Sequence, residues 1–361
     1  MERVEIVGAG YYVPDRVVTN AEICRMIPGW PPDKLGLKTG ILERRFLWAM
    51  DEKSGYPIEP TGPGKVIKSG VDMSEIALQK ALDMAGIEAA ELDALLLVTC
   101  TPDEINFESD AMHLADRMGV RPDARIIQID SGCGGALYLL SEAKEKVESG
   151  RYKYVALIAH NLTSALVDRD MYERFVQRDG RKLGAFLSPY IFGDGAGVLV
   201  LGPCSDPDRG FVNSWERQRL IEYMYREGGG GLKPPDSPRT SRVDHAFIID
   251  GGLVYKEFPV YMGNCVNGVL EGYEHLFPQI HRFFLHQANM RLVELFAKKA
   301  NLPMDRVPMH MDRYGNTSAA GTLILFAEDL QDGNVALGSG QLVLFATIGA
   351  GAHYAAHLIR L

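Results

Sequence analysis

The sequence predicts an α/β protein in which helices pack against sheets. Short apolar runs typical of buried strands, such as 94–100 (ALLLVTC) and 124–130 (ARIIQID), alternate with segments of helical periodicity. Strand–turn–helix arrangements occur in both halves of the chain, around Cys133 and around His286. The alternation indicates α/β layers and is compatible with a pseudo-repeat of two α/β halves.

The first half is expected to contain short strands and helices in rapid succession. Apolar runs mark its strands, and apolar residues three and four positions apart mark its helices. The expected elements are a strand at 4–14, a helix at 20–27 capped by Asn20, helices at 72–87 and 108–120, a helix from Cys133 to about Ser149, a strand at 154–160, and two strand pieces around a glycine turn at 190–202.

The second half repeats this alternation. Its expected elements are a helix from 256 onward, a strand at 282–286, a helix at 289–302, the loop 312–321 with its helix, and strands at 341–348 and 354–361. Glycine and proline predict loops at 50–70 and 226–242, and the charged segment 166–188 suggests an inserted helix or flap. We therefore divide the chain into halves 1–203 and 204–361, with insertions at about 50–70 and 166–188.

Composition and charge narrow the class of protein. The chain has 361 residues, of which 46% are hydrophobic, and a net charge of −9 without a long Lys/Arg run, which argues against nucleic-acid binding. The N-terminal residues read as a strand rather than a signal peptide, and no apolar run suits a membrane span. Five scattered cysteines and unpaired histidines give no metal spacing, so we expect no metal and a reducing, cytoplasmic setting.

The segment SGCGG places Cys133 among glycines where an apolar run ends and a helix begins. The partial positive charge of a helix N-terminus would lower the pKa of its thiol, and glycines would let a substrate carbonyl reach backbone N–H groups. Cys133 would then be a nucleophile. The alternative is a small buried cysteine at a tight strand–helix junction.

Two polar clusters accompany this cysteine. His286 ends an apolar strand in HQAN, before Gln287 and Asn289, and Asn316 follows a glycine in GNTSAAG. Considered alone, His286 would be a hydrogen-bonded structural residue about as often as a catalytic one. Asn316 alone would be a turn former or helix cap more often than a catalytic residue. Together with Cys133 they supply a nucleophile and two neutral donors, which suits the enolate oxygen formed when a malonyl thioester loses carbon dioxide.

The chain resembles β-ketoacyl-acyl-carrier-protein synthase III along nearly its whole length. The resemblance rests on GAGYYVPDRVVTNAEI, KTGILERR, SGCGGALYLL, FGDGAGVLVLG, HQANMRLVELFAKK, GNTSAAG and IGAGAHYAAHLIRL in that order. It implies a thiolase fold of two similar βα halves in five αβαβα layers, and a homodimer. It also implies that an acyl group passes from acyl-CoA to Cys133 and condenses with malonyl-acyl carrier protein or malonyl-CoA, without a cofactor, assisted by His286 and Asn316.

The resemblance extends to residues around the reacting groups. It implies an oxyanion hole formed by the backbone N–H groups of Cys133 and Ala350, and an acyl pocket bounded across the dimer by Phe107. It implies CoA or carrier contacts at Trp30, Lys38, Asn289 and Arg291. The family arginine upstream of FGDGAG is unmatched, and Arg181 or Lys182 would have to replace it. Asp194 in that motif would cap backbone N–H groups rather than bind a metal.

The two insertions set this chain apart from the compact members of the family. Because loops around a site determine substrate choice, we expect a specialised member, with a starter other than acetyl-CoA or a place in a secondary-metabolite (for example polyketide) pathway. One alternative is an acyltransferase that passes the acyl group from Cys133 to an alcohol, amine or thiol without decarboxylation; retention of Asn316 speaks against it. A catalytically inactive partner subunit is the other alternative, and retention of Cys133 and His286 speaks against that.

Overall fold

Two large sheets organise the chain in the computed structural model, which describes residues 2–105, 107–220, 222–350 and 353–361. The five-stranded sheet has the order β1 (Arg3–Tyr12), β11 (Gly195–Cys204), β8 (Val155–Asn161), β6 (Ala94–Thr99) and β7 (Arg125–Asp130). The four-stranded sheet has the order β12 (Gly210–Gln218), β17 (His353–Arg360), β16 (Leu342–Ile348) and β15 (Ile280–Leu285).

The two sheets share one topology. In each sheet, the first strand pairs antiparallel with the last, β1 with β11 and β12 with β17. The last strand also pairs antiparallel with the strand that precedes it in the same sheet, which is β8 in the first sheet and β16 in the second. That strand then pairs in parallel with an earlier one, β6 in the first sheet and β15 in the second. The predicted pair of similar α/β halves is therefore confirmed, although the exact boundary at residue 203 stays a prediction.

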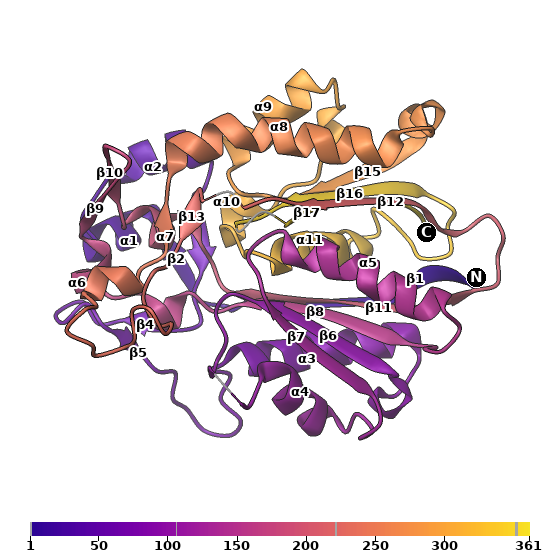
Figure 1. Cartoon of the computed structure of the whole chain (residues 1–361), viewed down its shortest axis with the longest axis horizontal. Helices are drawn as coiled ribbons and strands as arrows, with labels where there is room; N and C mark the ends of the chain where they lie inside the picture. Colours follow the sequence, from indigo (N-terminus) through magenta and orange to yellow (C-terminus); the bar gives the residue numbers. More distant parts are fainter. Residues whose placement is uncertain (1, 106, 221, 351–352) are drawn as a thin grey trace.

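Helices form three layers that alternate with the two sheets, which gives five layers in all (Figure 1). The middle layer is α5 (Gly135–Glu148) with α11 (Ala320–Gln331). The outer layers are α3 (Gly70–Ala85) with α4 (Asp110–Met118) on the first sheet, and α8 (Gly251–Leu270) with α9 (Met290–Lys299) on the second. Within the described ranges, no helix combines the length and the apolar character needed to cross a bilayer.

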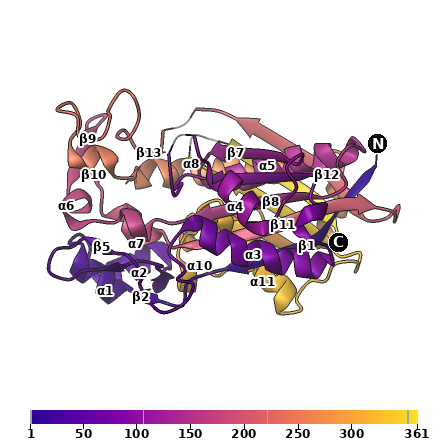
Figure 2. The same cartoon turned by 90° about the horizontal axis from the view of Figure 1, so that it is seen from below.

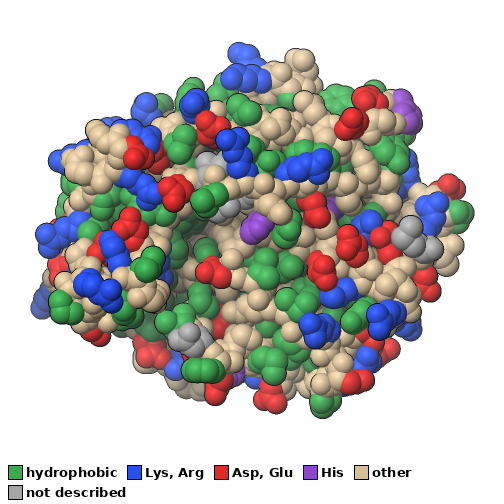
Figure 3. Space-filling model, viewed as in Figure 1, with side chains coloured by type: hydrophobic (Ala, Val, Ile, Leu, Met, Phe, Trp, Pro, Cys, Tyr) green, Lys and Arg blue, Asp and Glu red, His purple; other side chains and the backbone are tan. Residues whose placement is uncertain are grey.

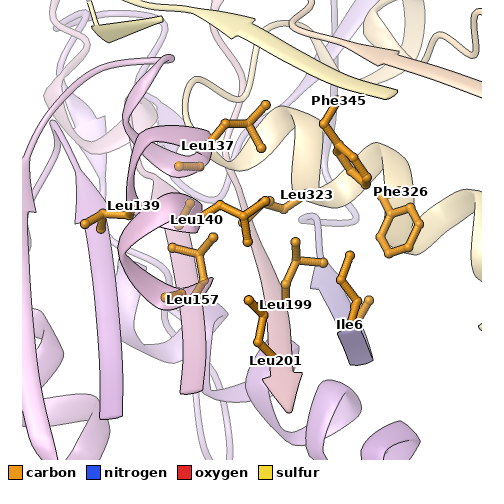
Figure 4. Close-up of a cluster of buried hydrophobic side chains, with 14 of the residues drawn as sticks. Ile6, Leu137, Leu139, Leu140, Leu157, Leu199, Leu201, Leu323, Phe326 and Phe345 are labelled. Carbon is orange, nitrogen blue, oxygen red and sulfur yellow. The ribbon is translucent and has the colours of Figure 1, made fainter. Parts of the chain in front are cut away.

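The main core lies between the sheets and encloses the middle layer (Figure 4). Ten residues of α11, Ala320 to Asp329, are buried, because this helix has a sheet on either side. Side chains from α5, α11 and strands of both sheets meet there: Leu137, Leu140, Leu323, Phe326, Ile6, Leu157, Leu199 and Phe345. A helix covered from both sides must be apolar around most of its circumference, which explains the run LILFA in α11.

Short elements form a lobe beside one end of the sheets, on the left in Figures 1 and 2. They have their own core, which includes Ile23, Phe46, Phe186 and Tyr190. The elements are α1 (Asn20–Met26), α2 (Pro32–Thr39), α6 (Arg169–Tyr172), α7 (Leu187–Ile191), α10 (Met311–Tyr314), and strands β2 (Val17–Thr19), β3 (Glu43–Arg45), β4 (Ala49–Met50), β5 (Pro57–Ile58), β9 (Phe175–Arg178), β10 (Arg181–Gly184), β13 (Met224–Tyr225) and β14 (Ile248–Ile249). Among the described residues, 3-10 helices lie at 89–91, 164–166, 242–245, 274–279 and 304–306.

Three local predictions are wrong. Asn20 does not cap α1, because Thr19 accepts the Glu22 N–H while the Asn20 amide donates to the Ile41 carbonyl (2.7 Å). Segment 190–202 contains one strand rather than two, since its first residues end α7 and β11 begins only after the glycine turn. The helix expected from 256 begins five residues earlier, at Gly251.

The charged insertion 166–188 is mainly a β-hairpin rather than a helix. Strands β9 and β10 pair antiparallel, with Arg178 opposite Arg181. The two residues between them, Asp179 and Gly180, have φ values of +50° and +72°, as a two-residue hairpin turn requires. The only helix inside the insertion before α7 is the four-residue α6. The hairpin faces the cavity described next.

Candidate active site

A cavity of about 760 Å³ lies where the lobe meets the ends of the two sheets. Cys133, His286 and Asn316 all line it, although they come from three distant segments. Cys133 lies between β7 and α5, His286 directly follows β15, and Asn316 lies shortly before α11. The fold thus brings the N-terminal ends of both middle-layer helices to the same cavity, where their partial positive charge favours an anion.

Cys133 is buried among apolar side chains and is 8% exposed. Its Sγ lies 3.6 Å from Ser318 Oγ and 4.0 Å from Asn316 Nδ2. The glycines beside it are needed for close packing: a Cβ at Gly134 would lie 1.9 Å from the His353 carbonyl oxygen. The glycine-rich segment is therefore explained by the close approach of the backbone after β16.

Burial raises the pKa of the Cys133 thiol, and the contacts from Ser318 and Asn316 only partly oppose this shift. The prediction that the helix N-terminus lowers the pKa of Cys133 is therefore wrong. The physical reason is that the sulfur is enclosed by Phe192, Ile249 and their neighbours, and an anion in apolar surroundings is poorly solvated. At neutral pH the Cys133 side chain is therefore a protonated thiol.

His286 is a neutral imidazole in this cavity. Burial lowers its pKa to about 3, because the charged form loses its solvation in the protein interior. Its backbone N–H donates to the Ala346 carbonyl (2.8 Å), which fixes the residue at the end of β15. Its Nδ1 is buried and has no hydrogen-bond partner in the described part of the chain.

The backbone of Asn316 is tied to the segment before β11. Its N–H donates to the Ile191 carbonyl (2.8 Å), and its carbonyl accepts from Gly193 (3.1 Å). Its Oδ1 accepts from the Ser318 N–H (2.8 Å), which leaves Nδ2 as the donor that faces Cys133. Ser318 has a φ of +54°, an unfavourable conformation for a serine that this local bond helps to hold.

Ser318 is a contact that the sequence reasoning missed. Its hydroxyl lies between two sulfurs, 3.6 Å from Cys133 Sγ and 3.7 Å from Cys100 Sγ. Burial raises the pKa of Cys100 to about 12, so this second thiol stays protonated. The only indication in the sequence was that Ser318 belongs to the motif GNTSAAG. The contact could not be predicted from it, because Ser318 and Cys133 are 185 positions apart along the chain.

Gly349 and Ala350, which follow β16, lie beside the cysteine segment. Ala350 lines the cavity, and a Cβ at Gly132 would lie 3.5 Å from the Ala350 nitrogen. The Thr347 hydroxyl donates to the Cys133 carbonyl (3.0 Å), which ties β16 to the residue that carries the thiol. A backbone N–H at Ala350 is thus close to the cysteine segment, in the region where the sequence led us to expect an oxyanion hole.

The mouth of the cavity carries four more of the expected residues: Trp30, Lys38, Asn289 and Arg291. The Asn289 amide is occupied within the protein, because Oδ1 caps α9 and Nδ2 donates to the Lys38 carbonyl (3.1 Å). Arg291 pairs with Glu294 at 3.0 Å. Figure 3 shows basic side chains, mixed with acidic ones, over the region of α2, β9 and β10.

Phe107 is the one expected site residue that does not line this cavity. It is fully exposed, and its φ of +49° places it in a conformation that is strained for a phenylalanine. Within a single chain it therefore does not bound an acyl pocket. Apolar walls come instead from residues that the sequence did not single out, among them Phe175, Phe192, Ile249 and Val254.

The hairpin and the glycine turn also contribute to the region. Lys182 lines the mouth and lies over the Phe175 ring, 4.3 Å from its centroid, in the stretch where the family arginine is unmatched. Asp194 lies deeper and accepts from the backbone N–H groups of Leu47 (2.8 Å), Thr163 (2.8 Å) and Ser164 (3.1 Å). The prediction that Asp194 accepts backbone N–H groups is confirmed, but the groups lie 30 to 147 positions away along the chain rather than in the local turn.

Comparison with known proteins agrees with this geometry. Residues 127–217 match the family model of 3-oxoacyl-(acyl-carrier-protein) synthase III, and 277–361 match the model of its C-terminal domain. The chain is 30% identical to beta-ketoacyl-(acyl-carrier-protein) synthase III of Geobacillus kaustophilus over 355 residues, which is 98% of each chain.

Solved structures show the same fold. The 3-oxoacyl-(acyl-carrier-protein) synthase III of Aquifex aeolicus superimposes with a TM-score of 0.80 at 24% identity, over 99% of this chain and all of the other. The priming beta-ketosynthase of the R1128 polyketide biosynthetic pathway gives 0.77 at 24% identity, over 100% and 97%. The predicted five-layered thiolase fold is thereby confirmed, and the chain belongs to the beta-ketoacyl-acyl-carrier-protein synthase III family.

Proposed function

We propose that this protein is a condensing acyltransferase that carries an acyl group on Cys133 and joins it to a malonyl thioester with loss of carbon dioxide. The observation that supports this most is the convergence of Cys133, His286 and Asn316 on one largely apolar cavity. Membership of the family supports the same reaction class. The reaction needs a thiol, two donors and dry surroundings, and it needs no cofactor.

The first half-reaction loads the enzyme. The Cys133 sulfur attacks the thioester carbonyl of acyl-CoA, the carbon–sulfur bond to CoA breaks, and the thiol proton ends on the CoA sulfur. Backbone N–H groups of Cys133 and Ala350 would stabilise the tetrahedral oxyanion. Because burial raises the pKa of the thiol, little thiolate is present before the substrate binds, and the thiol must lose its proton in the course of this half-reaction.

The second half-reaction consumes the malonyl thioester. Its carboxylate leaves as carbon dioxide, and the electron pair forms an enolate whose oxygen is stabilised by His286 Nε2–H and Asn316 Nδ2–H. The enolate carbon attacks the acyl carbonyl on Cys133, and the released thiolate then takes a proton from solvent. A neutral imidazole is the form that can donate without protonating the enolate, which agrees with a pKa of about 3 for His286.

We further propose an apolar starter that is larger than acetyl. The sulfur of Cys133 lies among Phe192, Ile249 and partly buried Ile191, Met224 and Val254, and the cavity volume is within the usual range for small-molecule sites. Each methylene that enters such surroundings gains about 0.8 kcal/mol. An acetyl group would leave most of this wall uncovered.

Intact-protein mass spectrometry after incubation with acyl-CoAs of increasing length tests the loading step. We expect a mass gain equal to one acyl group, faster with medium-length or branched donors than with acetyl-CoA. Cys133→Ala should abolish the gain. Cys204→Ala, which removes a cysteine of the same 8% exposure outside the cavity, should not. No gain with any donor, or a gain that survives Cys133→Ala, would refute the assignment.

Release of labelled carbon dioxide from malonyl-CoA or malonyl-carrier protein distinguishes condensation from simple acyl transfer.

The acyl donor and the malonyl thioester would enter by the mouth that carries Trp30, Lys38, Asn289 and Arg291. Because Asn289 is already a helix cap, we assign the phosphate or carrier contact to Lys38 and Arg291 rather than to Asn289. Arg291→Ala should raise KM for the carrier-bound or CoA-bound substrate with little change in kcat.

We also propose a homodimer in the cytoplasm. Strand β7 is the last strand of the first sheet and pairs only with β6 among the described residues. Its Ile126, Ile127 and Ile129 are only partly buried, and the fully exposed Phe107 precedes α4. All five cysteines are free, as a reducing compartment favours.

Light scattering should give twice the chain mass for wild type and for the control Met304→Asp. Phe107→Asp should shift the mass toward a single chain, and a monomeric wild type would exclude the dimer.

A further inference from the structure

Tyr223 connects the lobe to the loop after β16. It is buried, it lines the cavity, and its hydroxyl donates to the Gly349 carbonyl. Its own carbonyl accepts from the Asp250 N–H (2.8 Å), which fixes Tyr223 against the start of α8. A tyrosine held at its backbone and at its hydroxyl is a rigid support between these two segments.

The carbonyl that Tyr223 holds belongs to the same peptide unit as the Ala350 N–H. A trans peptide is planar, and its C=O and N–H point in opposite directions, so fixing one fixes the other. No described peptide bond is cis. With its carbonyl directed at Tyr223, the peptide must direct its N–H to the opposite side, and the Ala350 nitrogen lies close to the position of a Gly132 Cβ.

The neighbouring peptide unit is held by a different bond. Gly349 donates its own N–H to the His353 carbonyl (3.0 Å), and a Cβ at Gly349 would lie 1.9 Å from the Gly134 nitrogen. Packing and this bond therefore fix the position of Gly349. They do not determine the rotation of the next peptide about its own Cα–Cα axis, which the Tyr223 hydroxyl restrains.

We propose that Tyr223 is a positioning residue for the oxyanion hole: it orients the Gly349–Ala350 peptide so that the Ala350 N–H faces the acyl carbonyl on Cys133. The inference rests on the proposed function. Burial raises the pKa of Tyr223, so its hydroxyl keeps the proton that it donates throughout the working pH range. Tyr223 touches no reacting atom in this role, and its effect passes through one backbone amide.

The variant Tyr223→Phe removes the hydroxyl and retains the ring. Tyr190→Phe is the matched control, because the Tyr190 hydroxyl also donates to a backbone carbonyl, that of Ile27 (2.6 Å), but lies outside the cavity lining. Deleting an oxyanion donor typically lowers kcat 10²–10³-fold. Since the Ala350 N–H is still present in Tyr223→Phe, we expect about a tenfold loss in the rate of acylation from acyl-CoA.

The two half-reactions separate this role from a purely structural one. Carbon dioxide release from malonyl-CoA, measured in a Cys133→Ala background, depends on His286 and Asn316 and should be the same with and without Tyr223→Phe. Tyr190→Phe should change neither rate. An unchanged acylation rate in Tyr223→Phe, or an equal loss in both half-reactions, would overturn the proposal. A wild-type protein that no acyl-CoA acylates would instead overturn the proposed function, so the two failures are distinguishable.

Discussion

Replacing Asn316 by alanine should separate the two half-reactions. The substitution removes the Nδ2 donor that faces Cys133, and it removes Oδ1, the acceptor of the Ser318 N–H. The backbone bonds of residue 316 to Ile191 and Gly193 do not depend on its side chain and should persist. The cavity should therefore keep its shape while it loses one of the two donors proposed for the enolate oxygen.

The expected losses follow from these contacts. Removing one preorganised donor to a developing oxyanion costs about 10²–10³-fold in kcat, or ~3–4 kcal/mol. Acylation of Cys133 uses backbone N–H groups and should change less than threefold. The buried Ser318 N–H also loses its acceptor, which costs ~1–3 kcal/mol of unfolding free energy. Asn316→Asp keeps that acceptor but places a carboxylate beside a forming anion, so its condensation rate should fall at least as far.

Two measurements on the same protein check this reasoning. Acyl-enzyme formation is followed by intact mass, and carbon dioxide release is followed with labelled malonyl thioester after acylation is complete. Urea unfolding then reports whether the variants are folded at the assay temperature. An equal loss in both half-reactions, or full condensation activity in Asn316→Ala, would refute the two-donor role.

Three further predictions concern the framework of the site. Asp194→Ala leaves three backbone N–H groups, two of them buried and one partly buried, without their acceptor and should lower the free energy of unfolding by ~3–6 kcal/mol, measured by urea titration. Gly134→Ala should abolish acylation, because the new Cβ would lie 1.9 Å from a backbone oxygen, whereas Gly231→Ala, with open space around it, should be neutral in the same assay. Burial lowers the pKa of His357 to about 4 and that of His286 to about 3. The free energy of unfolding should therefore be greatest above pH 6.5, and below that pH each histidine should reduce it by on the order of 1 kcal/mol per pH unit. Urea unfolding midpoints measured at pH 7 and pH 5 check this expectation.

The sign of the pH effect follows from which state binds the proton. Below about pH 6.5 the unfolded histidines take up protons that the buried ones do not, so acid favours unfolding. A midpoint that does not fall between pH 7 and 5 would contradict this account. An Asp194→Ala protein as stable as wild type, or an active Gly134→Ala protein, would likewise contradict the packing and hydrogen bonds described above.

The residues that form the centre of the site were predictable because their motifs are local. Cys133, His286 and Asn316 each lie at a junction where an apolar run meets a glycine or a polar cluster, and junctions of that kind end up at the ends of the sheets. The alternation of strands and helices similarly predicted the layers. The hairpin at 175–184 also had a local signal, the Asp179–Gly180 pair between two short strands, but the surrounding charges obscured it.

Long-range contacts could not be predicted in this way. Tyr223 is separated from Gly349 by 126 positions, and Ser318 from Cys133 by 185, and no pattern along the chain links either pair. The raised pKa of Cys133 likewise depends on walls contributed by Phe192 and Ile249. A helix N-terminus is visible in a sequence, whereas the desolvation that outweighs it is a property of the assembled cavity.

The middle layer has a consequence for how the chain can be divided. Helix α5 belongs to the first half but packs on β17 as well as on β8, and α11 belongs to the second half but packs on β1 and β11. A cut in the loop 205–209 would thus leave each fragment with an apolar helix whose second covering surface is on the other fragment. We expect neither fragment to be stable when expressed alone, and the two to recover a native assembly only when they are refolded or expressed together.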